Sequence, residues 1–235
     1  GARMALLPYA IEVLDALVES FTPIDIALSS YGIREGLLYE QMSKKLRKKD
    51  PLIEACAFAE MKDARAPGFG LQLFKFVLPL FPTADDEAAR LIKAACHLHD
   101  VSWRGHPDYR AEICFDNATR ANLGGLKHAE RVFLGLSLMH RYRNQRKGHK
   151  FENLFSLLSQ EQMRMAEILG KAMRLGAMMW VNKEETNAKL FWAPDAKALQ
   201  LVLEGDAVSL YGEVAEARLK SLARAMNASF AFQAK

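Results

Sequence analysis

Residues 29–39 carry the run Ser-Ser-Tyr-Gly-Ile-Arg-Glu-Gly-Leu-Leu-Tyr, which directly follows the apolar segment Ile-Asp-Ile-Ala-Leu at 24–28. The apolar segment predicts a short strand, and the small and glycine residues after it predict a sharp turn. The spacing of apolar residues over 33–41 then predicts a helix. Another helix is expected upstream at 5–19. The first part of the chain is therefore expected to be a helix-strand-helix unit.

Beyond this unit the sequence predicts a mainly α-helical protein. Helical spacing and break signals place helices at 51–63, 71–80, 84–99, 108–121, 127–143, 158–178 and 213–226, with Thr83 as a candidate N-cap. The composition shifts near Trp180, and short strands are expected at 190–192 and 199–203. We therefore expect three parts: residues 1–45, a helical bundle at 46–180, and a small β-β-α appendix at 181–235.

The bulk composition is that of a globular protein. The chain has 235 residues, of which 50% are hydrophobic and 26% charged, enough for one large domain or two small ones. The apolar runs are too short to cross a bilayer, and no signal peptide is visible. Cys56, Cys96 and Cys114 lie in apolar helical segments, which favours reduced core thiols and a cytoplasmic protein.

The net charge is +4, and many of the basic residues lie in two blocks, Lys44–Lys49 and His140–Lys150. A solvated loop or helix end is one interpretation of each block. A polyanion contact is the other, because lysine and arginine neutralise phosphates and release counterions. The second block contains no carboxylate, so we expect it to bind a polyanion. Its candidate binding residues are Arg141, Arg143, Arg146, Lys147 and Lys150.

A possible metal-binding cluster begins with His99-Asp100 and continues with His106 and Asp108. A His-Asp pair at the end of an apolar helix is the signature of the HD phosphohydrolase superfamily, in which both side chains ligate a divalent metal together with an earlier His and a later Asp. This chain has no histidine before His97, and no aspartate between Asp116 and Asp195. We therefore expect a degenerate, metal-free corner in which His99 and Asp100 hydrogen-bond locally, and we expect no catalytic residue.

Two of these segments carry a resemblance to a known family. The run at 29–39 resembles the strand-turn-helix that closes the second actin-like domain of the exopolyphosphatase/guanosine pentaphosphate phosphohydrolase (Ppx/GppA) family. The segment Trp103–Arg110 is similar to the W-R-x-H-P-D-Y-R loop of alphaproteobacterial members. The helical remainder then resembles the HD-type C-terminal region of that family. Arg34 and Glu35 are expected either to form an ion pair or an orienting pair at the interface with the actin-like domain, or to be an ordinary pair on a helix surface.

The resemblance implies a hydrolase that removes the terminal phosphate of inorganic polyphosphate or the 5′ phosphate of guanosine pentaphosphate, with magnesium. It places the catalytic motifs in domains upstream of these residues, so this chain would have neither a catalytic residue nor a cofactor. Its implied role is to pack on those domains, to form a homodimer and to bind polyphosphate or another polyphosphorylated anion. We expect no specific nucleic acid and no membrane partner. Two alternatives are an independent metal-dependent HD-domain nucleotide phosphohydrolase and a scaffold without a ligand.

Overall fold

The computed structural model describes residues 2–26, 29, 31–144, 148, 150–179 and 187–235. The chain divides into two compact units, Gly1–Lys48 and Lys49–Lys235. The predicted boundary after residue 45 lies close to this division. The predicted boundary after residue 180 falls at residues 180–186, outside the described part of the chain.

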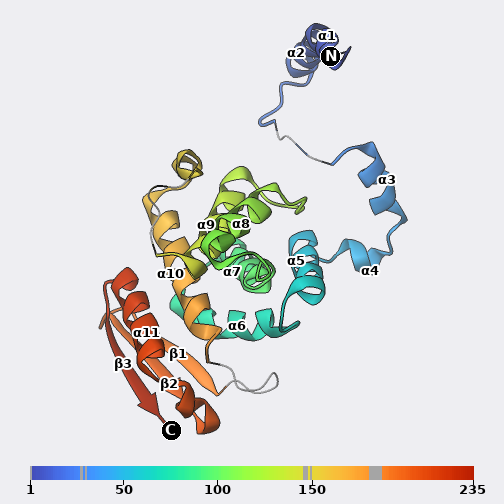
Figure 1. The fold of residues 1–235 in the computed structure, drawn as a ribbon. Coiled ribbons are helices and arrows are strands. Elements are labelled where there is room, and N and C mark those ends of the chain that lie inside the picture. Colours follow the sequence, from blue (N-terminus) through green and yellow to red (C-terminus); the bar gives the residue numbers. More distant parts are fainter. Residues whose placement is uncertain (1, 27–28, 30, 145–147, 149, 180–186) are drawn as a thin grey trace. The chain divides into compact units, whose positions relative to one another are not determined.

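The first unit consists of short helices. These are α1 (Ala2–Ala5), α2 (Leu7–Phe21), α3 (Ile33–Gln41) and α4 (Lys44–Arg47) (Figure 1). The helix predicted at 33–41 is confirmed as α3. The strand predicted at 24–28 is wrong for residues 24–26, which have irregular structure, while residues 27 and 28 are not described. A strand needs a neighbour for its backbone hydrogen bonds, and this unit offers none among its described residues.

The second unit contains the helical bundle. Its elements are α5 (Pro51–Asp63), α6 (Phe69–Val77), η1 (Leu78–Leu80), α7 (Asp86–Leu98), α8 (Pro107–Arg120), α9 (His128–Tyr142), η2 (Glu152–Leu157) and α10 (Gln160–Gly176). Figure 1 shows α5, α6, α8 and α10 placed around α7 and α9. The inner position of α9 explains why ten of its residues are buried.

Local capping fixes where several of these helices begin. The Asp50 carboxylate accepts hydrogen bonds from the backbone of Leu52 and Ile53, with Pro51 in the first turn of α5. The side chain of Ser159 caps α10 in the same way. The N-cap of α7 is Asp85, whose carboxylate accepts from the Ala88 backbone, so the prediction of Thr83 was wrong. An ionised carboxylate at this end also interacts favourably with the helix dipole.

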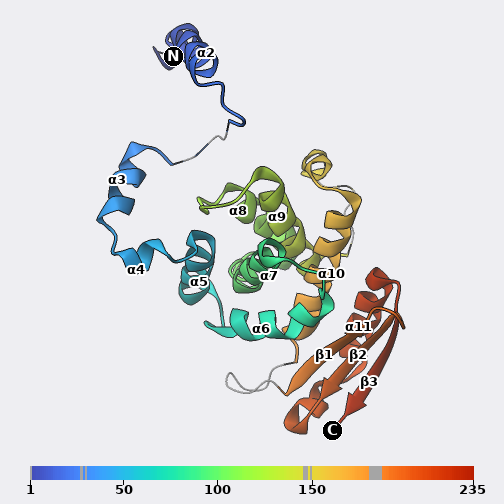
Figure 2. The ribbon, with the colours of Figure 1, turned by 180° about the vertical axis from the view of Figure 1, so that it is seen from behind.

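The C-terminal appendix is a β-β-α-β unit rather than the predicted β-β-α unit (Figure 2). Strands β1 (Ala188–Ala193) and β2 (Ala198–Leu203) are antiparallel. The chain then passes through η3 (Gly205–Leu210) and α11 (Glu213–Met226). It returns as β3 (Ser229–Ala234), which is parallel to β2. The last strand was missed because only its two phenylalanines are partly buried, which gives a weak apolar signal.

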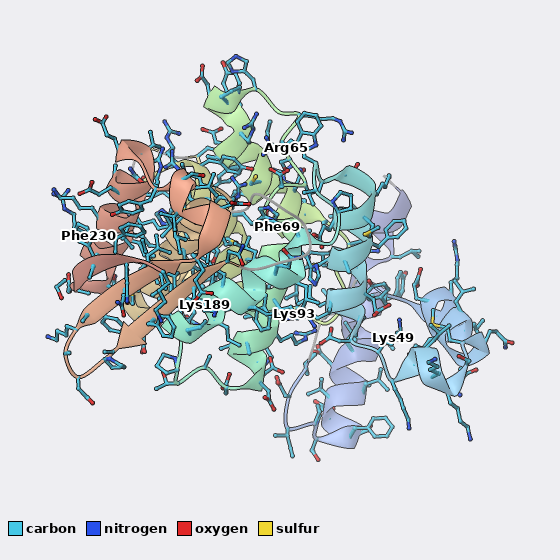
Figure 3. The ribbon with its side chains drawn as sticks, turned by 90° about the horizontal axis from the view of Figure 1, so that it is seen from below. Lys49, Arg65, Phe69, Lys93, Lys189 and Phe230 are labelled. Carbon is cyan, nitrogen blue, oxygen red and sulfur yellow. The ribbon has the colours of Figure 1, made fainter. Side chains whose placement is uncertain are left out.

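Helices and sheet of the second unit share one hydrophobic core. In Figure 3 the labelled Phe230 lies on the outer strand β3, and Lys189 lies on β1 toward α6.

The three cysteines are free and buried, as predicted. Burial raises the pKa of Cys56 to about 12 and that of Cys114 to about 11, so both thiols stay protonated. Within the described residues, no helix has the length and apolar character that crossing a membrane would require.

Candidate functional site: the Asp100 corner

His99 and Asp100 lie where α7 ends, and both are buried. Helix α7 stops at Leu98, and the chain then turns through residues 99–104. The relative exposure of each of the two residues is 3%. Burying an ionised carboxylate is costly unless it is paired, so the partners of Asp100 decide what this corner is.

Asp100 is paired with two arginines from distant segments. Arg65, after α5, donates from Nε to Oδ2 at 2.8 Å and from Nη2 to Oδ1 at 2.6 Å. On the other side, Arg141 Nη2 at the end of α9 lies 3.5 Å from Oδ1. Burial alone would raise the pKa of Asp100, but the hydrogen bonds from Arg65 and the charge of Arg141 outweigh it and lower this pKa. Asp100 is therefore an ionised carboxylate that pairs with two cations.

His99 is held as a neutral ring. Its Nδ1 lies 2.8 Å from the Cys96 carbonyl oxygen, and its ring contacts Phe69 edge-on at 5.3 Å between centroids. Burial, followed by the charge of Arg141, lowers the pKa of His99 to about 4. The local hydrogen bond expected for His99 is thus present, whereas the main partner of Asp100 is Arg65, far along the sequence. Figure 3 shows Arg65 and Phe69 in the same part of the second unit.

The predicted cluster does not assemble into a metal site. His106 Nδ1 and Asp108 Oδ2 lie 3.6 Å apart, but their side chains are 66% and 80% exposed, at the start of α8. Among the described residues, no group of three or more His, Cys, Asp or Glu side chains is arranged to hold a metal ion. The guanidinium groups of Arg65 and Arg141 occupy the carboxylate of Asp100, so the residues at this corner do not fit a divalent cation.

A second buried pair, which the sequence did not predict, lies beside this corner. His97 Nδ1 is 2.5 Å from Glu60 Oε2, and Glu60 Oε1 accepts from the Gly70 backbone at 2.6 Å. Glu60 is 1% exposed. His97 thus contacts α5 while His99 contacts Phe69, as expected for residues two apart on a helix. Through these two contacts, Glu60 connects α5 with both α6 and α7 close to Asp100.

The exposed side of the corner is an arginine-rich face built on Trp103, which we call the tryptophan face. Its residues are Arg65, Trp103, Arg104 and Arg110. The Trp103 indole N–H donates to the Asp63 carbonyl at 2.9 Å. The guanidinium carbons of Arg104 and Arg65 lie 4.9 and 5.7 Å from its ring centroid. Arg110 is fixed by two hydrogen bonds to the Gly105 carbonyl. This face therefore presents cations held in place by an aromatic ring and backbone carbonyls.

The structure describes three of the five basic residues predicted to bind a polyanion, and it places them in different surroundings. Arg141 is buried and belongs to the Asp100 corner, and its contact with a polyanion stays a prediction. Arg143 is half exposed, and its Nη1 lies 3.9 Å from Glu112. Lys150 is also half exposed, 3.2 Å from Asp116. Arg146 and Lys147 lie outside the described residues.

The Arg34–Glu35 motif forms the start of α3. The Glu35 carboxylate accepts from the Gly32 backbone at 2.7 Å, and this hydrogen bond lowers the pKa of Glu35. This is the reciprocal half of a capping box. A role at a domain interface stays a prediction for both residues.

The second unit is thus a helical domain with a small sheet appendix and an arginine-rich, metal-incompatible corner. A family model described as "Exopolyphosphatase, C-terminal" matches residues 52–232. The chain belongs to this exopolyphosphatase C-terminal family, which confirms the resemblance found in the sequence. No curated protein matches the chain.

The neutral state of His99 predicts that stability falls as the pH is lowered. A histidine in the unfolded chain takes up a proton near pH 6.5, but folded His99 does so only near 4. Between these values the unfolded state binds more protons, so stability present at pH 7 is lost as the pH falls from 6.5 toward 4. The expected slope is on the order of 1 kcal/mol per pH unit. Urea unfolding across this range measures it. His99→Gln should flatten the curve and His106→Gln should not; equal slopes in all three proteins would contradict the assignment.

Proposed function

We propose that this chain is the helical C-terminal part of an exopolyphosphatase-like hydrolase and binds polyphosphate for catalytic domains that lie upstream in the intact protein. Membership of the exopolyphosphatase family supports a hydrolase as the parent protein. Hydrolysis of the terminal phosphoanhydride of polyphosphate or of guanosine pentaphosphate, and the magnesium it uses, would belong to those upstream domains.

The observation that carries the proposal is the tryptophan face. The side chains of Arg65 and Arg104 are 56% and 65% exposed. Arg65 Nε and Nη2 already donate to Asp100, and Arg104 Nη1 lies 3.8 Å from Asp63 Oδ1, so the remaining N–H donors are those that can meet a phosphate. Arginine recognises phosphate oxygens through paired N–H donors. Contacts with Trp103 hold these side chains in place, which lowers the entropy lost when a polyanion binds. Inorganic polyphosphate or another polyphosphorylated anion is therefore the partner we propose.

The remaining partners follow from the first unit and from the family. All of α2 is exposed within its own unit, including apolar residues such as Ile11 and Leu14. Apolar helices of this kind need a packing partner, and we propose that α2 packs on the actin-like domains. A homodimer and a cytoplasmic location are part of the same proposal.

The alternative of a metal-dependent HD hydrolase gains no support, because the guanidinium groups of Arg65 and Arg141 already pair with the Asp100 carboxylate.

The proposal is tested by removing two cations of the tryptophan face. We expect the double variant Arg104→Gln/Arg110→Gln to bind long-chain polyphosphate a few-fold more weakly for each charge removed at low salt, with a shallower dependence on log salt. The matched control is Lys220→Gln/Arg224→Gln, two exposed residues of α11 that carry the same charge change. Fluorescence titration or calorimetry measures both proteins. Equal weakening in the two variants would show a general charge effect and contradict a site at this face.

A further inference from the structure

A cavity of about 450 Å³ opens to solvent beside α8. Cys114, Ala118 and Ala121 line it, and their spacing along the chain places them on one side of α8. Because these three side chains are small, α8 leaves a space next to Leu98 and Val101, which lie where α7 ends and the chain turns. Protein interiors normally fill such a space with side chains, and its volume is in the range of small-molecule sites.

The lining of this cavity is mostly apolar. Leu123 and Leu138, which also line it, are only 7% and 2% exposed, so they belong to the core of the second unit. Water makes few hydrogen bonds in an apolar space. Replacing that water with a hydrocarbon or aromatic group is favourable, because apolar surface on both sides is removed from water. The cavity therefore suits a ligand with an apolar body.

The polar residues that line the cavity are Ser102, Asp116, Asn117 and Arg120. Asn117 Nδ2 donates to Ser102 Oγ at 3.1 Å, which leaves the second N–H of this amide for another acceptor. The Arg120 side chain is 78% exposed, and its Nε lies 3.1 Å from Asp116 Oδ1. Within the described part of the chain the Nη groups of Arg120 have no acceptor, so they can meet the oxygens of a ligand.

The charges at this end of α8 favour an anion. Lys150 Nζ lies 3.2 Å from Asp116 Oδ2, so this carboxylate is flanked by Lys150 and Arg120, and one positive charge is left over. The Arg131 guanidinium also donates to the carbonyl oxygens of Ala121 and Leu123, at 2.8 and 2.7 Å. It thereby places a positive charge at the end of α8, where free helix carbonyls would otherwise repel an anion.

We propose that this cavity binds a small apolar monocarboxylate. Its hydrocarbon or aromatic body lies against Ala118, Leu123 and the other apolar lining, and its carboxylate pairs with the Nη groups of Arg120. A carboxylate matches the paired N–H donors of a guanidinium group in geometry and charge, and the Asn117 amide can donate to the same oxygens. This inference goes beyond the proposed function, because the ligand carries no phosphate and the tryptophan face takes no part in the site.

The test is calorimetric titration of the full chain with octanoate, with acetate and with octylammonium. We expect saturable binding of octanoate. Acetate lacks the apolar body and octylammonium has the opposite charge, so each should bind at least about tenfold more weakly. Absence of saturable octanoate binding would overturn the proposal, and so would octylammonium that binds as tightly as octanoate.

Two variants place the ligand in this cavity. Arg120→Gln should weaken octanoate binding about tenfold through loss of the charged pair, while an exposed side chain of this kind contributes little to folding. Ala121→Phe should fill the cavity and abolish binding, with circular dichroism as the check that the variant folds. The control Arg224→Gln removes an exposed charge from α11 and should bind octanoate within about twofold of the unmodified chain.

Unchanged affinity for octanoate in Arg120→Gln would overturn the proposal, whether or not Ala121→Phe folds. The Arg104→Gln/Arg110→Gln variant should keep full octanoate binding even where it binds polyphosphate more weakly. Failure of the cavity site and failure of the tryptophan face are therefore recognised separately.

Discussion

Replacing Asp100 with asparagine is expected to destabilise the second unit by about 3–5 kcal/mol, because it leaves a buried cation without a carboxylate. Arg65 is half exposed and can turn toward water, but the Arg141 side chain is only 8% exposed. Its charge would therefore remain in the protein interior without the partner that now lies 3.5 Å away. The free energy of unfolding in urea, measured at neutral pH, gives the size of this effect.

Asp108→Asn is the matched control, since it makes the same chemical change on a side chain that is 80% exposed. It should alter the free energy of unfolding by no more than about 0.5 kcal/mol. If Asp100→Asn lowered the free energy of unfolding no more than this control does, Asp100 would not be the carboxylate that pairs with Arg65 and Arg141. A metal site would then again have to be considered for Asp100.

The second large effect is expected for Gly170→Ala. The added Cβ would lie 2.4 Å from the His140 Cβ and 2.8 Å from the His140 carbonyl carbon, so α9 and α10 would have to move apart. Overpacking of this kind costs about 1–3 kcal/mol, and more where backbone must shift. The shift would also displace Arg141, which follows His140. Thermal or urea unfolding measures the loss of stability.

Gly212→Ala serves as the control for this substitution. Nothing lies within 4 Å of a Cβ at position 212, at the N-cap of α11. We expect a change of about 0.5 kcal/mol, from the loss of a favourable N-cap residue. Equal effects of the two substitutions would show that α9 and α10 are not in backbone contact at Gly170.

The helices were predictable because their signals are local. Asp50-Pro51 and Ser159 with Gln162 are start signals contained within a few residues, and the structure places helix starts at both. Strands depend on distant segments, and the strand predicted at 24–28 is wrong for residues 24–26 for that reason. The missed strand β3 has a weak apolar pattern of its own and pairs with β2. A strand forms only where a neighbouring strand pairs with it, and the sequence of one segment does not say whether that neighbour exists.

The site was harder to predict because its partners are far apart in sequence. The His99-Asp100 motif was located correctly, but its chemistry depends on Arg65, which lies in a loop before Pro67. The absence of acids within the His140–Lys150 block suggested exposed, unpaired cations. Arg143, Lys150 and Arg141 instead lie near Glu112, Asp116 and Asp100, which belong to other segments. Glu60 gave no signal in the sequence, because a single acid in an amphipathic helix is normally exposed.

The most direct test is the binding of long-chain polyphosphate by the unmodified chain, compared with single-stranded DNA, between about 50 and 200 mM salt. We expect saturable binding of polyphosphate, with an affinity that falls linearly on a log–log plot against salt, and weaker binding of the DNA. No polyphosphate binding at the lowest salt concentration would contradict a polyanion-binding role for this chain.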